Sequence, residues 1–311
     1  MSMTSLFGNL NVLMQDDDHV DDLMVVDTSN IAVATLMANF LPKTQNDINI
    51  DIVRHLICDT IRQNVMRFKA EYPDIVLALD SNKYWRKTVA PYYKKKRKEE
   101  HEKSDWDWDR LNGFLNPVYG EVRDNLPYKA LQVDYAEGDD VIGILTKHAV
   151  AEGRRVLVVS ADSDGVQLQR YSGVVQWSPT QKKWVKPKYG TPQNDLRMKI
   201  IKGDKKDSIA SIKSRSDYVA TRVEGERAPS IMQKELDVWL DAVDPTLEMT
   251  PEMAARYKEN ERLRDFNFIP KDVEKAILEA YNAPKIGNKS KMQKYFIQNR
   301  MVRMAEKMSD F

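Results

Sequence analysis

The sequence predicts an α/β fold in which a mainly parallel central sheet is flanked by helices and followed by a helical C-terminal region. The first observation is that short apolar runs at 23–26, 75–79 and 156–160 alternate with longer amphipathic segments. The second is that these runs are rich in Val, Ile and Leu, as are strands buried on both faces of a sheet. The third is that the apolar spacing becomes mainly helical from about residue 191.

The composition favours a globular protein that acts in solution. Hydrophobic residues make up 42% and charged residues 31% of the 311 residues, which argues against a disordered chain and allows one large domain or two smaller ones. The net charge of +1 does not indicate a class of partner, so a partner must be inferred from local charged patches. A single cysteine, Cys58, excludes an intramolecular disulfide. Because no long apolar run and no signal peptide is found, we expect a cytoplasmic protein without membrane contact.

Residues 1–22 are expected to form a flexible acidic tail ahead of a core that spans 23–190. The aspartates between residues 16 and 22 should be solvated. A short apolar patch, SLFGNL, precedes them and contains Leu6 and Phe7. A disordered terminus is the favoured interpretation, and a docking peptide for another protein is the alternative.

The segments between the apolar runs predict the remaining elements of the core. Residues 51–70 and 139–151 carry apolar side chains at helical spacing. Residues 174–185 indicate a hairpin with Trp177 and Trp184 on its two arms. In a sheet built from strand–helix repeats, ligands bind at the carboxyl ends of the strands.

The C-terminal region, residues 191–311, is expected to be helical. One helix should begin near Asp195, and others are expected over 231–243, 251–264 and 270–282. The polar stretch 203–230 has no clear periodicity.

Acidic side chains follow the apolar runs where each predicted strand ends. They are Asp27, Asp80, Asp162 and Asp164, and the segment YAEGDDVIGILTKHAV adds Glu137 and Asp140. Carboxylates that meet at one sheet edge repel one another unless a cation is present. Mg²⁺ and Mn²⁺ prefer such oxygen ligands, and two ions about 4 Å apart support chemistry at phosphorus. The sequence therefore predicts a divalent-metal site.

Any one of these acids alone could be a helix cap or a turn residue. That alternative weakens when four such positions fall on the same sheet edge. Glu137 and Asp140 are three residues apart, so a helix places them on one face. Asp139 points elsewhere in a regular helix, unless the first turn is distorted.

Two further acidic pairs have regular spacing. Asp162 and Asp164 flank one residue, so an extended segment places them on the same side. Asp204 and Asp207 in KGDKKDSI are three residues apart. From spacing alone, an ordinary solvated turn is the favoured interpretation of this second pair.

A basic and aromatic segment directly follows Asp80. Residues 83–103 hold nine Lys or Arg and three Glu, which leaves a net charge of +6, and four Tyr or Trp are interleaved with them. Cations of this kind meet phosphates, while the rings stack on bases. A solvated helix face is the common alternative for a charged run. The position beside Asp80 favours a nucleic-acid strand as the ligand. A second basic segment, 197–215, could hold duplex phosphates.

Other site motifs are missing from the sequence. There is no GxGxxG, and GNKS at 287–290 lacks the Gly-Lys pair of a phosphate loop. The four histidines have no zinc-ligand spacing, and no GxSxG is found.

Six motifs, in order, resemble the 5′-nuclease superfamily, which includes flap endonucleases. They are VVDTSN, LALDSNKYWR, PYYKKKR, YAEGDD, SADSD and GDKKDSI. Further segments, including TRVEGER at 221–227, resemble its branch of T-even phage ribonuclease H enzymes, and the resemblance extends from about Leu23 to beyond Arg264. One departure is that the segment after GDKKD lacks the glycine-rich turn of many relatives, which makes a K⁺ site doubtful.

The resemblance implies a role for each matched acid. One Mg²⁺ would be held by Asp27, Asp80, Glu137, Asp140 and Asp162. A second Mg²⁺ would be held by Asp164, Asp204 and Asp207, and Mn²⁺ could replace either ion. Asp139 joins the ligand set without assignment to either ion. The resemblance thus overrides the solvated-turn interpretation of 204–207.

The basic residues are also matched. Lys94 and Arg97 would contact the scissile phosphate in an arch over 86–110, so they join Asp27, Asp80, Asp140 and Asp162 as catalytic residues. Nucleic acid would further be bound by Arg86, by Tyr93 stacking on a terminal base, and by Lys202, Lys205 and Lys206. The last three lie in a helix-turn-helix-like duplex-binding segment over 194–225.

These matches imply a metal-dependent 5′ to 3′ nuclease with ribonuclease H, exonuclease and flap-endonuclease activity in DNA replication. It would remove RNA primers and adjacent DNA from lagging-strand fragments. The expected partners of this monomer are DNA and RNA–DNA hybrids with a 5′ end or flap, a sliding clamp through the N-terminal tail, and a single-strand DNA-binding protein through the C-terminal region. A phage origin would place it in the host cytoplasm. The alternatives are a non-catalytic branched-DNA-binding protein of the same fold and an unrelated Mg²⁺-dependent α/β phosphatase.

Overall fold

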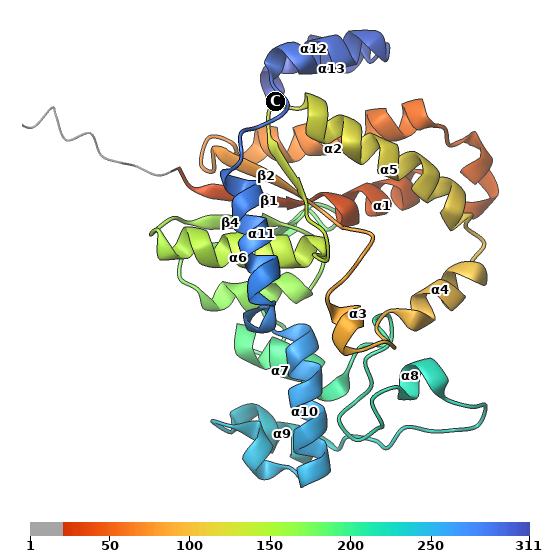
Figure 1. The fold of residues 1–311 in the computed structure, drawn as a ribbon, viewed down its shortest axis with the longest axis vertical. Coiled ribbons are helices and arrows are strands. Elements are labelled where there is room, and N and C mark those ends of the chain that lie inside the picture. The colour runs from red at the N-terminus through yellow and green to blue at the C-terminus, as the bar shows by residue number, and fades with distance from the viewer. Residues whose placement is uncertain (1–20) are drawn as a thin grey trace, which may run out of the picture.

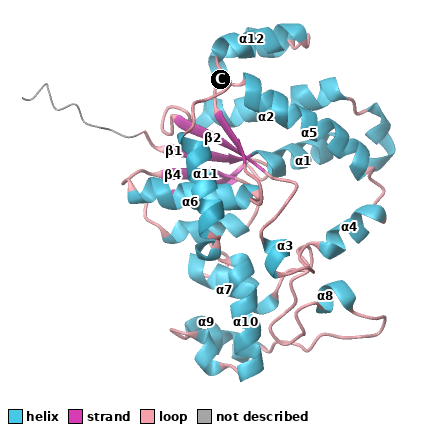
Figure 2. Ribbon diagram, in the orientation of Figure 1, coloured by secondary structure: helices cyan, strands magenta, loops and turns pink. Residues whose placement is uncertain are grey.

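The computed structural model describes residues 21–311, which fold around a six-stranded sheet (Figures 1 and 2). The strands are β1 (Leu23–Asp27), β2 (Asp74–Leu79), β3 (Lys129–Gln132), β4 (Val156–Val159), β5 (Val174–Ser178) and β6 (Lys183–Trp184), in the order β3-β2-β1-β4-β5-β6. The pairs from β3 to β5 are parallel, and β6 is antiparallel to β5. The predicted α/β class with a mainly parallel sheet is confirmed.

The strand order brings the predicted acids together. β1 lies between β2 and β4, and Val26 is paired with Leu77 on one side and with Val159 on the other. Because these three strands run in the same direction, their carboxyl ends lie at one edge. The hairpin is also found, with Trp177 paired directly to Trp184.

Alternate side chains of β1 enter two different cores, as the two-residue period of a strand requires. Met24 and Val26 pack with α1 (Thr28–Asn39), α2 (Ile50–Phe68) and α5 (Trp108–Asn125). Leu23 and Val25 pack with α6 (Gly138–Ala151) and α11 (Lys271–Asn282) on the other face.

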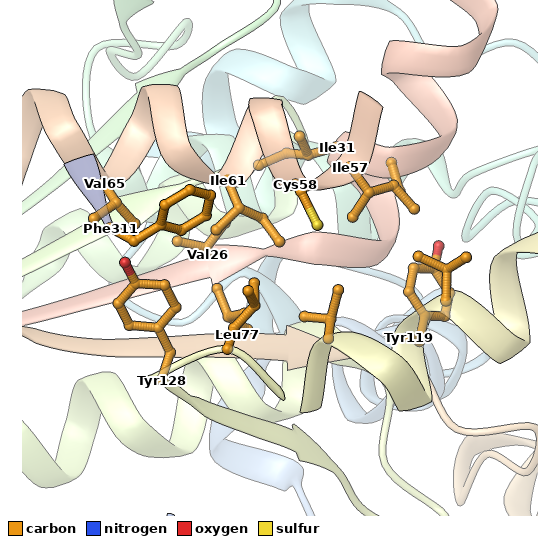
Figure 3. Packing of buried hydrophobic residues seen from close by; sticks show 14 of the residues in the cluster. Val26, Ile31, Ile57, Cys58, Ile61, Val65, Leu77, Tyr119, Tyr128 and Phe311 are labelled. Carbon is orange, nitrogen blue, oxygen red and sulfur yellow. The ribbon is translucent and has the colours of Figure 1, made fainter. Parts of the chain in front are cut away.

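Helix α2 supplies much of the first core. Ile57, Ile61 and Val65 point from one face of α2 toward Val26 and Leu77 of the sheet (Figure 3). Full burial of each such side chain stabilises the fold by about 1.5–3 kcal/mol before entropy is counted. This face is the apolar face that was predicted over 51–70.

The C-terminal region does not form one separate unit. A satellite core joins α7 (Pro192–Lys202), α9 (Gln233–Asp241) and α10 (Pro251–Arg264). In contrast, α12 (Lys289–Gln298) packs on α5, α13 (Val302–Glu306) packs on α2, and α11 packs on α6. Figure 1 shows α12 and α9 at opposite ends of the molecule. The chain therefore leaves the sheet after β6 and returns to it from α11 onward.

The remaining helices are short. They are α3 (Arg86–Val89), α4 (Lys95–Glu102), α8 (Tyr218–Thr221) and the 3₁₀ helices η1 (Pro42–Asp47), η2 (Asp164–Arg170), η3 (Pro245–Glu248), η4 (Phe266–Phe268) and η5 (Met308–Asp310). Within residues 21–311, no helix combines the length and apolarity needed to cross a bilayer.

Two expected segments differ in the structure. Asp22, which we assigned to the tail, is largely buried and forms an ion pair with Arg155 at 2.6 Å. The helix-turn-helix-like segment over 194–225 has one full helix, α7, and its second helix, α8, is a single turn. The polar loop between them is ordered by a bridge between Asp204 and Ile209 rather than by helix formation.

Candidate metal centre

A cavity of about 510 Å³ lies where β1, β2 and β4 end. The acidic residues that line it are Asp27, Asp80, Glu137, Asp139, Asp162, Asp164 and Asp207. Lys94, Arg97 and Tyr84 line it as well. The structure therefore brings together most of the predicted acids and the two predicted phosphate-contacting cations.

Asp27 is both the last residue of β1 and the N-cap of α1. Its Oδ1 accepts the Asn30 N–H at 3.2 Å, and its Oδ2 accepts the Ser160 hydroxyl at 2.7 Å. Burial, opposed by the Ser160 hydrogen bond and reinforced by Asp80, raises the pKa of Asp27 to about 7. The Asn30 N–H and the Ser160 hydroxyl thus hold the carboxylate in place, but they do not neutralise its charge.

The N-terminus of α6 contacts the Asp80 carboxylate through Gly138. The Gly138 N–H donates to Asp80 Oδ1 at 2.7 Å. A Cβ at this position would lie 3.3 Å from the same oxygen, closer than nearly all such contacts. Gly138 therefore permits the close approach of helix and strand end, and this role was not predicted. The partial positive charge of a helix N-terminus favours the carboxylate.

Asp139 and Asp162 complete an acidic group with Asp27 and Asp80. Burial and the charges of Asp162 and Asp27 hold the pKa of Asp139 well above its usual range. Burial and Asp164 raise the pKa of Asp162. Within residues 21–311, no basic side chain forms an ion pair with any of the four acids. We call these four residues the open group.

The donor set of the open group fits a hard divalent cation, because every candidate ligand is a carboxylate oxygen. Burial and, after it, mutual repulsion raise the pKa of Asp139, and a bound cation would offset the repulsion. In the described part of the chain, no three Asp, Glu, His or Cys side chains are grouped as direct ligands of one ion.

The placement of Asp140 corrects our expectation that it faces a metal. Its side chain is fully buried and pairs with Arg86 at 2.8 Å. Its Oδ2 also accepts the Trp85 indole N–H at 3.1 Å and the Glu137 backbone N–H at 2.9 Å. The last contact is half of a capping box, which turns the N3 side chain back toward the helix start. Asp139, not Asp140, therefore lines the cavity.

Glu137 is the N-cap of α6 and is surrounded by cations. Its carboxylate contacts Arg86 at 2.7 Å and also pairs with Lys94. The Tyr93 hydroxyl donates to it at 3.1 Å. Burial alone would raise the pKa of Glu137, but Lys94 and Arg86 outweigh it and lower the value to about 2.

Arg86 and Tyr93 are placed differently from the prediction that they contact nucleic acid. Both are nearly fully buried. Arg86 is held by Glu137 and Asp140, and its Nε–H donates to the Leu263 carbonyl at 2.9 Å. Tyr93 packs in a small core with Ile209 and Leu263, which leaves its ring face covered. Their side chains anchor the arch to the body of the protein instead.

Tyr84 is the aromatic residue of the arch that lines the cavity, and the more deeply buried Tyr119 of α5 lines it as well. Tyr84 is half-buried, and the Lys94 ammonium lies 5.0 Å from its ring centre. Tyr84 is one of the four aromatic residues counted in 83–103, but the resemblance implies base stacking for Tyr93 instead. Only the fold of the arch distinguishes the two rings.

A second acidic group is fully paired. Asp164 binds Lys199 and lies 2.7 Å from Arg264. Arg264 also pairs with Asp204 at 2.7 Å and with Asp207 at 3.1 Å, and Arg97 pairs with Asp207 at 3.0 Å. Burial alone would raise the pKa of Asp164, but Arg264 and Lys199 hold it well below its usual range. We call Asp164, Asp204 and Asp207 the paired group.

The arch and the loop after α7 are joined beside the paired group. The Lys94 N–H donates to the Asp207 carbonyl at 2.9 Å, and the Lys96 N–H donates to the Ser208 hydroxyl at 2.9 Å. Gly203 starts this loop with φ +70°, where a Cβ would lie 2.4 Å from the Ile209 carbonyl oxygen. Glycine is required there for both reasons. Asp204 itself lies outside the cavity wall, where it pairs with Arg264 and accepts the Lys206 N–H at 2.8 Å.

The three predicted duplex-binding lysines are exposed on this loop and at the end of α7. Lys202, Lys205 and Lys206 all point to solvent. Three partners of the acids, Arg86, Lys199 and Arg264, were not predicted as part of the site or were given another role. Arg86 ends the matched segment LALDSNKYWR, whereas Lys199 and Arg264 lie outside the six matched motifs.

Comparisons with known proteins agree with this architecture. Residues 22–190 match the family model of the 5′-3′ exonuclease N-terminal resolvase-like domain, and residues 190–311 match that of the T4 RNase H C-terminal domain. The chain is 39% identical over 303 residues to the ribonuclease H of Enterobacteria phage T4, which covers 96% of this chain and 99% of that protein. It is 26% identical over 211 residues to DNA polymerase I of Bacillus caldotenax, which covers 65% of this chain and 23% of the polymerase.

Two solved structures share the fold. A flap endonuclease of bacteriophage T5, in a pseudo-enzyme-product complex with DNA and metal ions, has a TM-score of 0.59 and 15% identity, and it covers 84% of this chain and 99% of that one. A second structure of the T5 protein, co-crystallised with metal ions, has a TM-score of 0.57 and 15% identity, and it covers 90% of this chain and 98% of that one.

Proposed function

The chain belongs to the 5′-3′ exonuclease family, and from this membership we propose that its cavity is a divalent-metal centre that cuts RNA and DNA from a 5′ end. The protein is a 5′-3′ nuclease of DNA replication. The specific role that we propose is removal of RNA primers and adjacent DNA from lagging-strand fragments, together with cleavage of 5′ flaps.

The observation that carries this proposal is the open group beside two cations. Asp27, Asp80, Asp139 and Asp162 have no ion pairs within residues 21–311, and Lys94 and Arg97 line the same cavity. Bound Mg²⁺, or Mn²⁺ in its place, would supply an activated water and stabilise the leaving oxygen. The open group would hold one such ion, and we propose a second near Asp164 and Asp207.

The residues around the cavity would position the strand that is cut. Lys94 and Arg97 would neutralise the scissile phosphate as they exchange their present carboxylate partners for it. The half-buried ring of Tyr84 offers a surface for the adjacent base. Ser160 and the Asn30 N–H keep Asp27 in one orientation. Hydrolysis would leave a 3′ hydroxyl on the released piece and a 5′ phosphate on the remaining strand.

The exposed lysines would bind the duplex next to the cut. Lys202, Lys205 and Lys206 project from the end of α7 and the following loop, which hydrogen-bonds to the arch. Phosphate contacts of this kind fix register without reading sequence. We therefore propose DNA and RNA–DNA hybrids with a 5′ end or flap as substrates of a monomer.

The test is a cleavage assay on a 5′-labelled flap and on a nicked RNA–DNA hybrid. Short labelled oligonucleotides should appear with Mg²⁺ and disappear with a chelator. Tight binding to the flap without any cleavage would favour the non-catalytic DNA-binding alternative. Release of the label as free phosphate, with the strand intact, would favour a phosphatase.

Two protein partners belong to the same proposal. The apolar patch SLFGNL, our candidate for sliding-clamp contact, lies outside the described residues. A single-strand DNA-binding protein is proposed to contact the helical C-terminal region. Deleting residues 1–10 should weaken clamp binding, measured by surface plasmon resonance, and should leave cleavage of a free nicked hybrid unchanged. Unchanged clamp binding would remove the patch from consideration.

A further inference from the structure

Arg264, the last residue of α10, lies at the centre of the paired group. Its guanidinium Nη1 is 2.7 Å from Asp164 and 3.1 Å from Asp207, and its Nη2 is 2.7 Å from Asp204. The side chain is only 4% exposed. Among the described residues, its Nε and Nη2 have no partner with hydrogen-bond geometry, whereas Nη1 donates to Asp164 Oδ2 at 2.7 Å.

The charges of this group already balance. Arg264 is joined by Lys199 on Asp164 and by Arg97 on Asp207, so each carboxylate has a cation of the chain beside it. The open group has no such partner within residues 21–311. A guanidinium and a divalent ion placed among the same carboxylates repel each other. Arg264 therefore opposes the binding of a divalent ion at the paired group.

We propose that Arg264 is a built-in counter-cation that occupies the place of the second metal ion in the protein without nucleic acid. One divalent ion then binds tightly at the open group, while a second binds weakly, because it must displace Arg264 and Lys199 from their carboxylates. This inference rests on the proposed metal-dependent function. Arg264 acts here as a positioning residue, since it sets the charge and place of Asp164, Asp204 and Asp207.

The experiment is a titration of the full-length protein with Mn²⁺ in the absence of nucleic acid, followed by electron paramagnetic resonance of the free ion. Wild type should bind one Mn²⁺ at least ten-fold more tightly than the second. Arg264→Gln should tighten the second site at least ten-fold and leave the first unchanged. Arg264→Lys keeps the positive charge, so it should remain close to wild type.

The matched control is Arg262→Gln, which removes an exposed arginine of the same helix and should change neither site. Because Arg264 is buried, thermal melting must show that its variants fold. Lys199→Gln gives an independent test at a side chain that is 22% exposed, and it should tighten the second site by a smaller factor.

Two equally tight sites in wild type would overturn the inference while leaving the metal-dependent function intact. An unchanged second site in folded Arg264→Gln and Lys199→Gln would do the same. Failure of wild type to bind any Mn²⁺ would instead contradict both the inference and the proposed metal centre. The cleavage assay with and without Mg²⁺ then shows whether the inference alone has failed or the proposed metal centre has failed with it.

Discussion

The two acidic groups of the cavity are built from the same residue type but differ in charge balance. In the open group, Asp27 is buried and forms no ion pair within residues 21–311, and burial raises its pKa to about 7. In the paired group, Asp164 is surrounded by Arg264 and Lys199, and its pKa is held well below the usual range. The side chains beside a carboxylate, rather than its residue type, determine whether its charge is already neutralised or is left for an external cation to neutralise.

The largest expected effect comes from removing a member of the open group. Asp139→Asn should reduce single-turnover cleavage of a flap by about 10³-fold, as loss of a transition-state contact does. It should not lower the melting temperature of the metal-free protein, because it relieves repulsion from Asp162 and Asp27. Cleavage within ten-fold of wild type would exclude Asp139 from the metal centre.

Asp140→Asn should have the opposite signature. It leaves the buried Arg86 guanidinium without a full counter-charge, so we expect about 3 kcal/mol loss in the free energy of unfolding. Urea denaturation measures this loss, and Asp134→Asn, at an exposed position nearby, is the control. If stability is unchanged while cleavage disappears, the assignment of Asp139 and Asp140 must be exchanged.

Lys94 is paired with Glu137, and it also lines the cavity that contains the open group. Lys94→Ala should slow single-turnover cleavage by about 100-fold with a smaller change in substrate affinity. The exposed Lys95→Ala in the same arch is the matched control. Equal losses in both variants would mean that the arch contributes general charge and no specific phosphate contact.

The smallest expected signal is in the pH dependence of stability. The pKa of Asp27 is raised in the folded state, so its contribution to stability is present below the unfolded pKa of about 4 and is lost as the pH rises through about 7. Glu137 behaves oppositely, and its contribution is lost as the pH falls toward about 2. Asp27→Asn should flatten the stability profile of the metal-free protein between pH 4 and 7. A profile identical to wild type would contradict the raised pKa.

Adding Mg²⁺ provides a control for this profile. The ion should restore at pH 8 the stability that Asp27 loses on ionisation, because it binds only the folded protein. The same addition should have little effect on Asp139→Asn, in which the open group is weakened. Chemical denaturation at fixed Mg²⁺ concentration measures both.

Local sequence pattern predicted the central elements correctly but missed several others. The runs that became β1, β2 and β4 are continuous and β-branched, so burial on both faces is visible in them. β3 reads KALQ, which lacks that signature, and its pairing with β2 decides its conformation. Helix α5 was missed because Gly113, Pro117 and Gly120 interrupt its sequence, although it buries one face in the core.

The site was predicted unevenly for a physical reason. Strand-end acids are visible because the strands around them are, and the family resemblance added Asp204 and Asp207. Lys94 and Arg97 were predicted through the family resemblance, but Lys199 and Arg264 were not, because an ion pair such as Asp164–Arg264 joins residues that are far apart along the chain. The residue pattern of neither segment shows that such a pair will form.

The sequence alone determined the central strands of the sheet, the edge at which their acids gather and the kind of chemistry that those acids support. These features follow from local rules, since strand direction and the two-residue period place side chains without knowledge of distant segments. Only the tertiary structure decided that Asp139 faces the cavity while Asp140 faces Arg86, that Tyr84 is open while Tyr93 is covered, and that Arg264 lies among the second group of acids. Those outcomes depend on long-range packing and charge pairing.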